Sequence, residues 1–108
     1  MKLLLDESVP KALGFLLMPH FVRSAQNAGF SGLLNGQLLN AMLVDGYDAL
    51  ITFDQNLPYQ QNTDLPVFVY VLKAKNNRVE TAIRFAPLII SALETPSPQR
   101  LTIIELPT

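Results

Sequence analysis

The stretch Ala49–Pro58, with the sequence ALITFDQNLP, decides how the rest of the chain is interpreted. Its first half is a short apolar run between Gly46 and a polar, proline-containing end, which predicts a buried strand over residues 48–53. Strands with apolar residues on both faces are typical of parallel sheets that helices cover. Asp54 follows at the carboxyl end of this strand, where open α/β sheets bind their ligands. The stretch therefore predicts a parallel α/β sheet with an acid at its functional edge.

The start of the chain repeats this arrangement. Residues 2–5 (KLLL) form a second short apolar strand, and Asp6 and Glu7 follow it directly. If the two strands are neighbours in the sheet, their chains lie about 4.8 Å apart, and the carboxylates of Asp6 and Asp54 can reach one cation. Carboxylate oxygens, with water completing the shell, are the usual ligands of Mg²⁺ or Mn²⁺.

Asp6 and Asp54 are therefore the candidate catalytic and metal-binding residues. Such ions catalyse phosphoryl transfer by activating water and stabilising the developing charge. The structural alternative is that Asp6 caps the turn that follows it and that Asp54 forms a local turn with Asn56. Glu7 is either a further ligand or a solvated surface acid.

Composition limits the classes of protein that the chain can belong to. Its 108 residues are 49% hydrophobic and 16% charged, which predicts a single folded domain over residues 1–108. The net charge of −1 argues against a strongly basic nucleic-acid binder but not against a local basic patch. Cysteine is absent, no apolar run is long enough to cross a bilayer, and the first strand is too short for a signal-peptide core because Asp6 and Glu7 interrupt it. We expect a soluble, cytoplasmic protein with no membrane partner.

Alternating elements extend the α/β prediction along the chain. Further strands are expected over 21–24, 66–72 and 101–106, and helices over 9–18, 36–45 and from residue 78 to 93. Ser8 is a candidate N-cap for the first helix, and Asn77 with Glu80 has the spacing of a capping box for the last. Gly46 should end the second helix, and Pro87 should kink the last one. The order of elements predicts a three-layer α/β/α sandwich with a mostly parallel central sheet.

Basic residues follow the strand over 66–72, again at its carboxyl end. Lys73, Lys75 and Arg78 are candidates for holding phosphate groups near the metal, and the alternative is a solvated loop. Tyr59 is a candidate for stacking on a base, or else an aromatic residue that covers the core. These four residues are the predicted substrate-binding set.

Three segments of the chain together resemble the PIN-like proteins, which are small single-domain relatives of the PIN nucleases. The segments are residues 3–10 (LLLDESVP), 33–39 (LLNGQLL) and 50–58 (LITFDQNLP). The resemblance implies an α/β/α sandwich with an acidic pocket at the strand ends, in which Asp6 matches the first acid and Asp54 a later one. It also implies Mg²⁺- or Mn²⁺-dependent cleavage of RNA. Relatives often act as the toxin of a toxin–antitoxin pair, so an antitoxin protein is an implied partner.

The chain departs from the pattern of these relatives at Gln37. Relatives tend to carry an acid there, on the first turn of the second helix, whereas Gln37 offers a neutral carbonyl oxygen. Asn56 likewise offers only a neutral oxygen. A hard cation would lose a formal charge of ligation, so we expect a metal site that is weakened or lost, with Gln37 and Asn56 as its further, neutral ligands.

Two other functions fit some of the same residues. The first is a catalytically inactive PIN-like module that binds RNA or a protein partner. The apolar loop over residues 30–34 (FSGLL) would then be a contact for an antitoxin or for a second copy, unless it packs on its own core.

The second alternative is a receiver-like phosphoacceptor domain. Asp6, Glu7 and Asp54 resemble the acid pair and the phosphorylated aspartate of such domains. However, Lys73 stands where a receiver needs Ser or Thr, and residues 105–107 (ELP) stand where it needs Lys.

Overall fold

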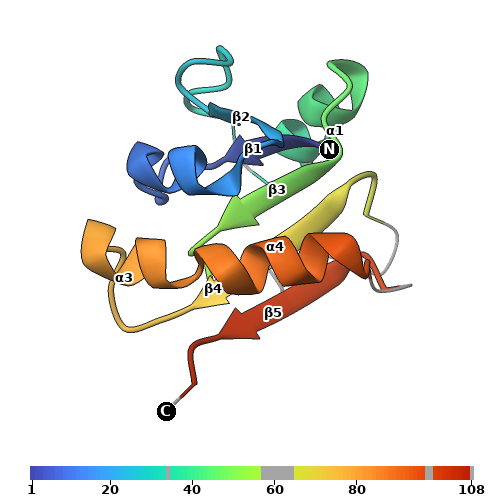
Figure 1. Cartoon of the computed structure of the whole chain (residues 1–108). Helices are drawn as coiled ribbons and strands as arrows, with labels where there is room; N and C mark the ends of the chain where they lie inside the picture. Colours follow the sequence, from blue (N-terminus) through green and yellow to red (C-terminus); the bar gives the residue numbers. More distant parts are fainter. Residues whose placement is uncertain (34, 57–64, 97–98, 108) are drawn as a thin grey trace.

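A five-stranded sheet forms the centre of the computed structural model, which describes residues 1–33, 35–56, 65–96 and 99–107 (Figure 1). The strand order is β2-β1-β3-β4-β5, and every neighbouring pair is parallel. The strands are β1 (Lys2–Leu5), β2 (Phe21–Ser24), β3 (Ala49–Thr52), β4 (Phe68–Lys73) and β5 (Leu101–Glu105). The predicted sheet is confirmed, and within the described residues it is wholly parallel.

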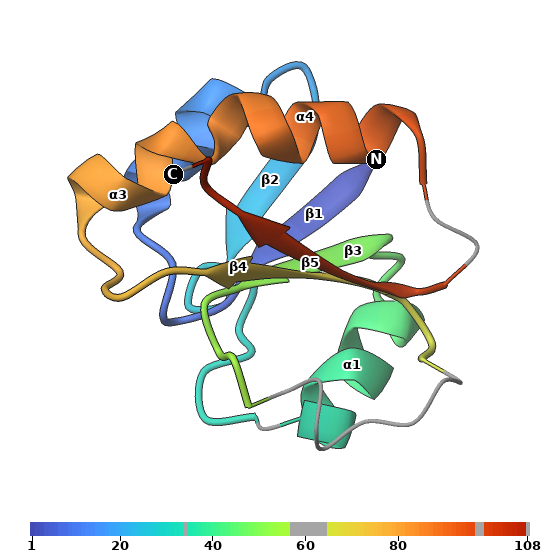
Figure 2. The same cartoon turned by 90° about the horizontal axis from the view of Figure 1, so that it is seen from below.

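Helices cover both faces of this sheet. The 3₁₀ helix η1 (Lys11–Leu17) and the helices α3 (Val79–Arg84) and α4 (Ala86–Glu94) lie on one face, and α1 (Asn35–Val44) lies on the other (Figure 2). The three-layer α/β/α prediction is therefore confirmed. No helix in the described part of the chain is long and apolar enough to cross a membrane.

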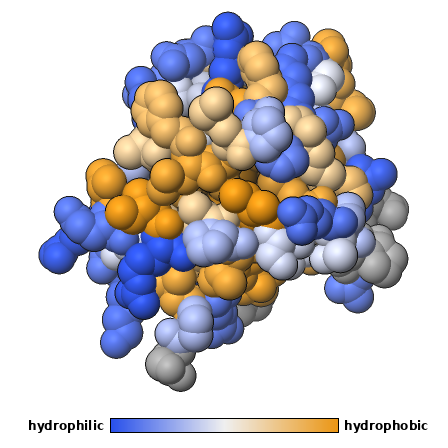
Figure 3. All heavy atoms as spheres, viewed as in Figure 1, coloured by the Kyte–Doolittle hydropathy of each residue, from blue (hydrophilic) through white to orange (hydrophobic). Residues whose placement is uncertain are grey.

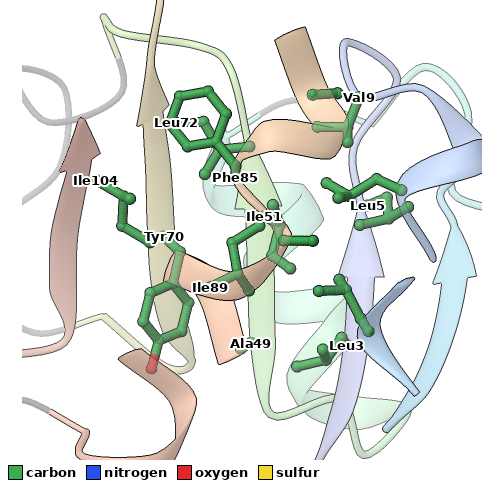
Figure 4. Packing of buried hydrophobic residues seen from close by; sticks show 14 of the residues in the cluster. Leu3, Leu5, Val9, Ala49, Ile51, Tyr70, Leu72, Phe85, Ile89 and Ile104 are labelled. Carbon is green, nitrogen blue, oxygen red and sulfur yellow. The ribbon is translucent and has the colours of Figure 1, made fainter. Parts of the chain in front are cut away.

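The buried apolar side chains of the strands join one of two clusters, according to the face of the sheet on which they lie. Leu3, Leu5 and Ile51 pack with the η1, α3 and α4 side, together with Phe85 and Ile89 (Figure 4). The alternate residues Leu4, Leu50, Val69 and Val71 pack on the α1 side. Burial of each such side chain contributes about 1.5–3 kcal/mol, so apolar strands are stable only when both faces are covered.

The first helix differs from its prediction over residues 9–18. It is a 3₁₀ helix whose N-cap is Pro10, not Ser8, and no side chain caps it. Leu13 and Leu17 are buried as expected, but Leu16 is exposed. Gly14 explains how closely the segment packs: a Cβ atom there would lie 3.2 Å from Cγ1 of Val22 in β2.

The last predicted helix is two helices, α3 and α4, which meet at Phe85 just before Pro87. The kink predicted from Pro87 is confirmed, because proline cannot continue the hydrogen-bond ladder. The prediction of a capping box at Asn77 and Glu80 is wrong. Arg78 is the N-cap of α3, without a side-chain cap, and Asn77 instead donates from Nδ2 to the carbonyl of Ser8 at 2.9 Å.

The apolar loop before α1 packs against the core. The ring of Phe30 meets that of Tyr47 edge-on, with 5.8 Å between centroids, and Leu33 packs against the same cluster. Of the two alternatives for this loop, packing on its own core therefore holds for Phe30 and Leu33. Leu34 lies outside the described residues.

Candidate functional site

The carboxyl edge of the sheet contains a topological switch point. In the sheet, β1 and β3 are neighbours. From β1 the chain continues to β2, which lies toward one edge of the sheet, and from β3 it continues to β4, which lies toward the other edge. Sheets of this order bind ligands outside the strand ends at the point where the connections diverge, which here lies between β1 and β3. Asp6 follows β1, and its N–H donates to the carbonyl of Ile51 in β3 at 3.1 Å. Asp54 follows β3, so both predicted acids lie at this point.

The carboxylate of Asp6 is held by hydrogen bonds from neutral donors. Its Oδ1 accepts from the backbone N–H of Ser8 at 2.7 Å and from the Ser8 hydroxyl. Its Oδ2 accepts from the hydroxyl of Thr52, which is fully buried. The capping role predicted as the structural alternative for Asp6 is confirmed.

The two hydroxyl groups extend this network to the segment that contains Asp54. Ser8 Oγ accepts from the N–H of Phe53 at 3.1 Å, and Thr52 Oγ1 accepts from the N–H of Asp54 at 2.9 Å. Asp54 is half-buried, and its Oδ1 accepts from the N–H of Asn56 at 3.0 Å, which is the predicted local turn. The ends of β1 and β3 are thus joined through Asp6, Ser8 and Thr52.

The remaining predicted ligands do not take part in the hydrogen-bond network around Asp6. Glu7 is exposed, and its Oε1 accepts from the N–H of Gly32 at 3.2 Å. Gln37 is exposed in the first turn of α1, where the prediction placed it, and Asn56 is exposed as well. Tyr59 lies outside the described residues.

These donors do not fit a complete Mg²⁺ or Mn²⁺ site. Both carboxylate oxygens of Asp6 already accept hydrogen bonds, and Glu7 bonds to Gly32. Within the described residues, no group of three or more Asp, Glu or His side chains stands close enough to hold an ion. Asp6 and Asp54 are the only predicted acidic ligands that share one network, and two carboxylates alone bind Mg²⁺ only together with waters and substrate phosphates.

A basic groove adjoins the acids on the β4 side. The groove has a volume of about 470 Å³ and is lined by Gln55, Lys73, Ala74, Lys75, Asn76, Thr81, Arg84, Glu105, Leu106 and Pro107. Lys73 Nζ lies 3.5 Å from Glu105 Oε1, in a pair exposed to solvent. Gln55, the neighbour of Asp54, donates from Nε2 to the carbonyl of Ala74 at 2.6 Å. This bond joins the segment with Asp54 to the wall of the groove.

The predicted phosphate-binding residues are only partly brought together. Lys73 and Lys75 line the basic groove, but Arg78 does not appear in its lining. Arg84 lines it instead and was not predicted. Thr81 and Arg84 are three residues apart on α3, so they share the helix face that borders the groove. The same spacing separates Thr81 from Arg78, so spacing along the sequence does not distinguish Arg84 from Arg78.

The ends of β4 and β5 also bear on the receiver-like alternative. A receiver needs Ser or Thr at the position of Lys73, and it needs Lys near the position of Glu105. Here Lys73 and Glu105 form an ion pair with each other instead.

Comparisons of the chain with protein-family models, with curated proteins and with solved structures find no match.

Proposed function

We propose that the protein is a PIN-like domain that binds single-stranded RNA along the carboxyl edge of its sheet, with a ribonuclease-type acid pair whose metal site is weakened. The observation that carries this proposal is the hydrogen bond from Gln55 to Ala74, because it joins the basic groove to the segment with Asp54. A strand of RNA in the groove would therefore pass beside the acids at the switch point.

The lining of the groove suits a phosphodiester backbone. Lys73, Lys75 and Arg84 provide the positive charge that phosphate contacts require. Asn76, Thr81 and Gln55 add amide and hydroxyl groups, which contact phosphate and sugar oxygens in nucleic-acid complexes.

RNA binding is tested with a labelled single-stranded 12-mer, whose fluorescence anisotropy reports the Kd in the presence of EDTA. We expect Lys75→Ala/Arg84→Ala to weaken binding about tenfold or more, since two phosphate contacts are lost. The matched control is Lys11→Ala/Arg23→Ala, which removes one Lys and one Arg, both exposed, on the η1 and β2 side of the molecule. An equal loss in both variants would mean that net charge, not the groove, binds the RNA.

Hydrolysis of the bound RNA is the second candidate function, and the position of Asp6 and Asp54 at the switch point of the sheet favours it. We expect slow cleavage with millimolar Mn²⁺ and none in Asp54→Asn. Cleavage that persists unchanged in Asp54→Asn would exclude Asp54 as a participant. A protein that binds RNA but never cleaves it would be the inactive binding module. A role as the toxin of a toxin–antitoxin pair rests on the resemblance alone.

A further inference from the structure

A second groove lies at the opposite edge of the sheet, between η1 and the edge strand β2. It has a volume of about 320 Å³ and is lined by Leu5, Lys11, Gly14, Phe15, Met18, His20, Val22, Arg23, Ser24 and Asn27. We call it the edge groove. Neither the acids nor the basic groove of the proposed RNA site contributes to it, so it requires its own explanation.

Large apolar side chains are exposed at the edge groove. Phe15 is 77% exposed and Met18 is 71% exposed, and both line it, while Phe21 in β2 is 52% exposed beside it. Figure 3 views the face that η1, α3 and α4 cover, and apolar side chains gather across this face. Large apolar patches that remain in contact with water usually mark an interaction surface.

The strand that borders the edge groove has an open hydrogen-bonding edge. The N–H of Phe21 donates to the carbonyl of Met1 at 3.2 Å, and the N–H of Ala25 donates to the carbonyl of Leu5 at 2.8 Å. The odd-numbered residues of this segment therefore direct their backbone groups toward β1. In a parallel ladder the residue between two such positions points its N–H and C=O the other way. Val22 therefore directs its backbone groups outward, where no described strand lies.

The two faces of β2 differ in what they would offer to an added strand. Val22 packs with the cluster on the η1 side, so the alternate side chains of Phe21 and Arg23 lie on the opposite face. The guanidinium carbon of Arg23 lies 5.8 Å from the centre of the Phe21 ring. The charged residues in the lining are Lys11 and Arg23, and no Asp or Glu is among the described lining residues. The charge at this edge of the sheet, from Lys11 beside the groove and Arg23 on the other face of β2, is thus complementary to an acidic partner.

We propose that the open edge of β2 binds an extended segment of a partner protein as an added strand, in which apolar residues alternate with acidic ones. Its backbone pairs with Val22, its apolar side chains enter the edge groove against Phe15 and Met18, and its acids face Arg23. Strand addition of this kind takes affinity from main-chain hydrogen bonds and specificity from pockets for alternate side chains. A groove between an edge strand and a helix supplies both.

The test starts with a displayed library of random octapeptides, selected on the full chain at low salt. We expect an enriched consensus with alternating acidic and apolar residues. The best peptide is then synthesised and its Kd is measured by calorimetry. In NMR spectra, the amide shifts on binding should concentrate at residues 15–18 and 22–24. No enrichment, or a consensus that is basic or lacks acids, would overturn the proposal.

Variants then separate strand addition from other kinds of binding. Phe15→Ser and Arg23→Glu should each weaken the peptide at least tenfold. The matched control Val44→Ser removes an apolar side chain that is 88% exposed on α1, and should leave the Kd within twofold. N-methylation of one set of alternate peptide amides should abolish binding and N-methylation of the other set should not, whereas binding that survives both would rule out an added strand. Since Phe15 and Arg23 are exposed, melting curves are expected to show that both variants remain folded. Dimerisation of the free chain that is lost in Phe15→Ser would instead identify a second copy as the occupant and overturn the proposal.

Discussion

Thr52 is the residue that most directly joins the two halves of the candidate site. Its buried hydroxyl donates to Asp6 and accepts from the N–H of Asp54, so a single oxygen links the ends of β1 and β3. Ser8 makes the corresponding link from Asp6 to Phe53. Removal of either hydroxyl would leave a carboxylate oxygen and a backbone N–H without this partner.

Replacement of the Thr52 hydroxyl should therefore be costly. We expect Thr52→Val to lower the free energy of unfolding by about 1–3 kcal/mol, because the polar groups around it lose their hydrogen bonds. Thr52→Ser keeps the hydroxyl, removes one methyl group and should lower it by only about 1 kcal/mol. Urea unfolding measures both. A loss in Thr52→Ser with none in Thr52→Val would show that packing of the methyl group, and not the hydrogen bonds, makes Thr52 important.

Tyr70 offers a second test at the scale of one residue. Its hydroxyl is buried and has no hydrogen-bond partner among the described residues, and burial raises the pKa of this tyrosine above its ordinary value of 10.0. We expect Tyr70→Phe to raise the free energy of unfolding near neutral pH by about 1 kcal/mol, since a buried hydroxyl without a partner is removed.

The raised pKa of Tyr70 also predicts a pH dependence. Above pH 10 the unfolded chain loses the phenol proton while the folded chain keeps it, so the unfolded state binds fewer protons and stability falls as pH rises. Below pH 10 this contribution is fully present. Urea unfolding between pH 8 and 11 should therefore show a steeper alkaline loss in the wild type than in Tyr70→Phe. Parallel curves would mean that Tyr70 ionises equally easily in both states.

Strand periodicity was enough to predict that Asp6 and Asp54 lie at one edge, because parallel strands end together. It could not predict the whole hydroxyl network, since the bonds from Thr52 to Asp6 and from Phe53 to Ser8 depend on the register between β1 and β3. The sequence also led us to group Arg78, and not Arg84, with Lys73 and Lys75. The difference depends on how α3 is turned against β4, which is a tertiary property.

At the scale of elements, local signals predicted the strands better than the helix ends. The strands over 2–5 and 21–24 have the bounds that the sequence predicted. The first helix is present but shorter than predicted and of the 3₁₀ type, and Gly14 allows a close approach to β2 that no periodicity reveals. The capping box at Asn77 was mistaken because Asn76 takes part instead, accepting from the N–H of Arg78 at 3.0 Å and from the hydroxyl of Thr81 at 2.7 Å.

The end of α1 was predicted correctly, and it allows a test with two substitutions of opposite sign. Gly46 has a φ of +81°, and the N–H of Tyr47 donates back to the carbonyl of Met42 at 2.9 Å, which closes the helix. Gly46→Ala should lower the free energy of unfolding by about 1 kcal/mol, because a Cβ is strained in this conformation. Gly36→Ala lies inside α1 in open space and should raise it by up to about 1 kcal/mol. Thermal unfolding of both variants measures the difference, and a loss at Gly36 as large as that at Gly46 would contradict this account.

At the scale of the whole molecule, the distribution of charge separates the two grooves. The net charge is only −1, so the chain as a whole provides no attraction for RNA, and binding must depend on local cations. The basic groove contains Lys73 beside Glu105, along with Lys75 and Arg84, whereas the edge groove has no acid among its described lining residues. The same fold thus presents an edge suited to phosphate and an opposite edge suited to carboxylate with apolar side chains.

The salt dependence of RNA binding follows from this local charge. Three cation–phosphate contacts to a single strand should make the affinity fall about 20-fold between 50 and 200 mM salt. In Lys75→Ala/Arg84→Ala only Lys73 remains, and the fall should be about threefold. Anisotropy titrations at four salt concentrations give the slope for each protein. A wild-type slope no steeper than that of the variant would show that Lys75 and Arg84 make no phosphate contacts. The RNA would then have to bind elsewhere on a chain whose total charge repels it.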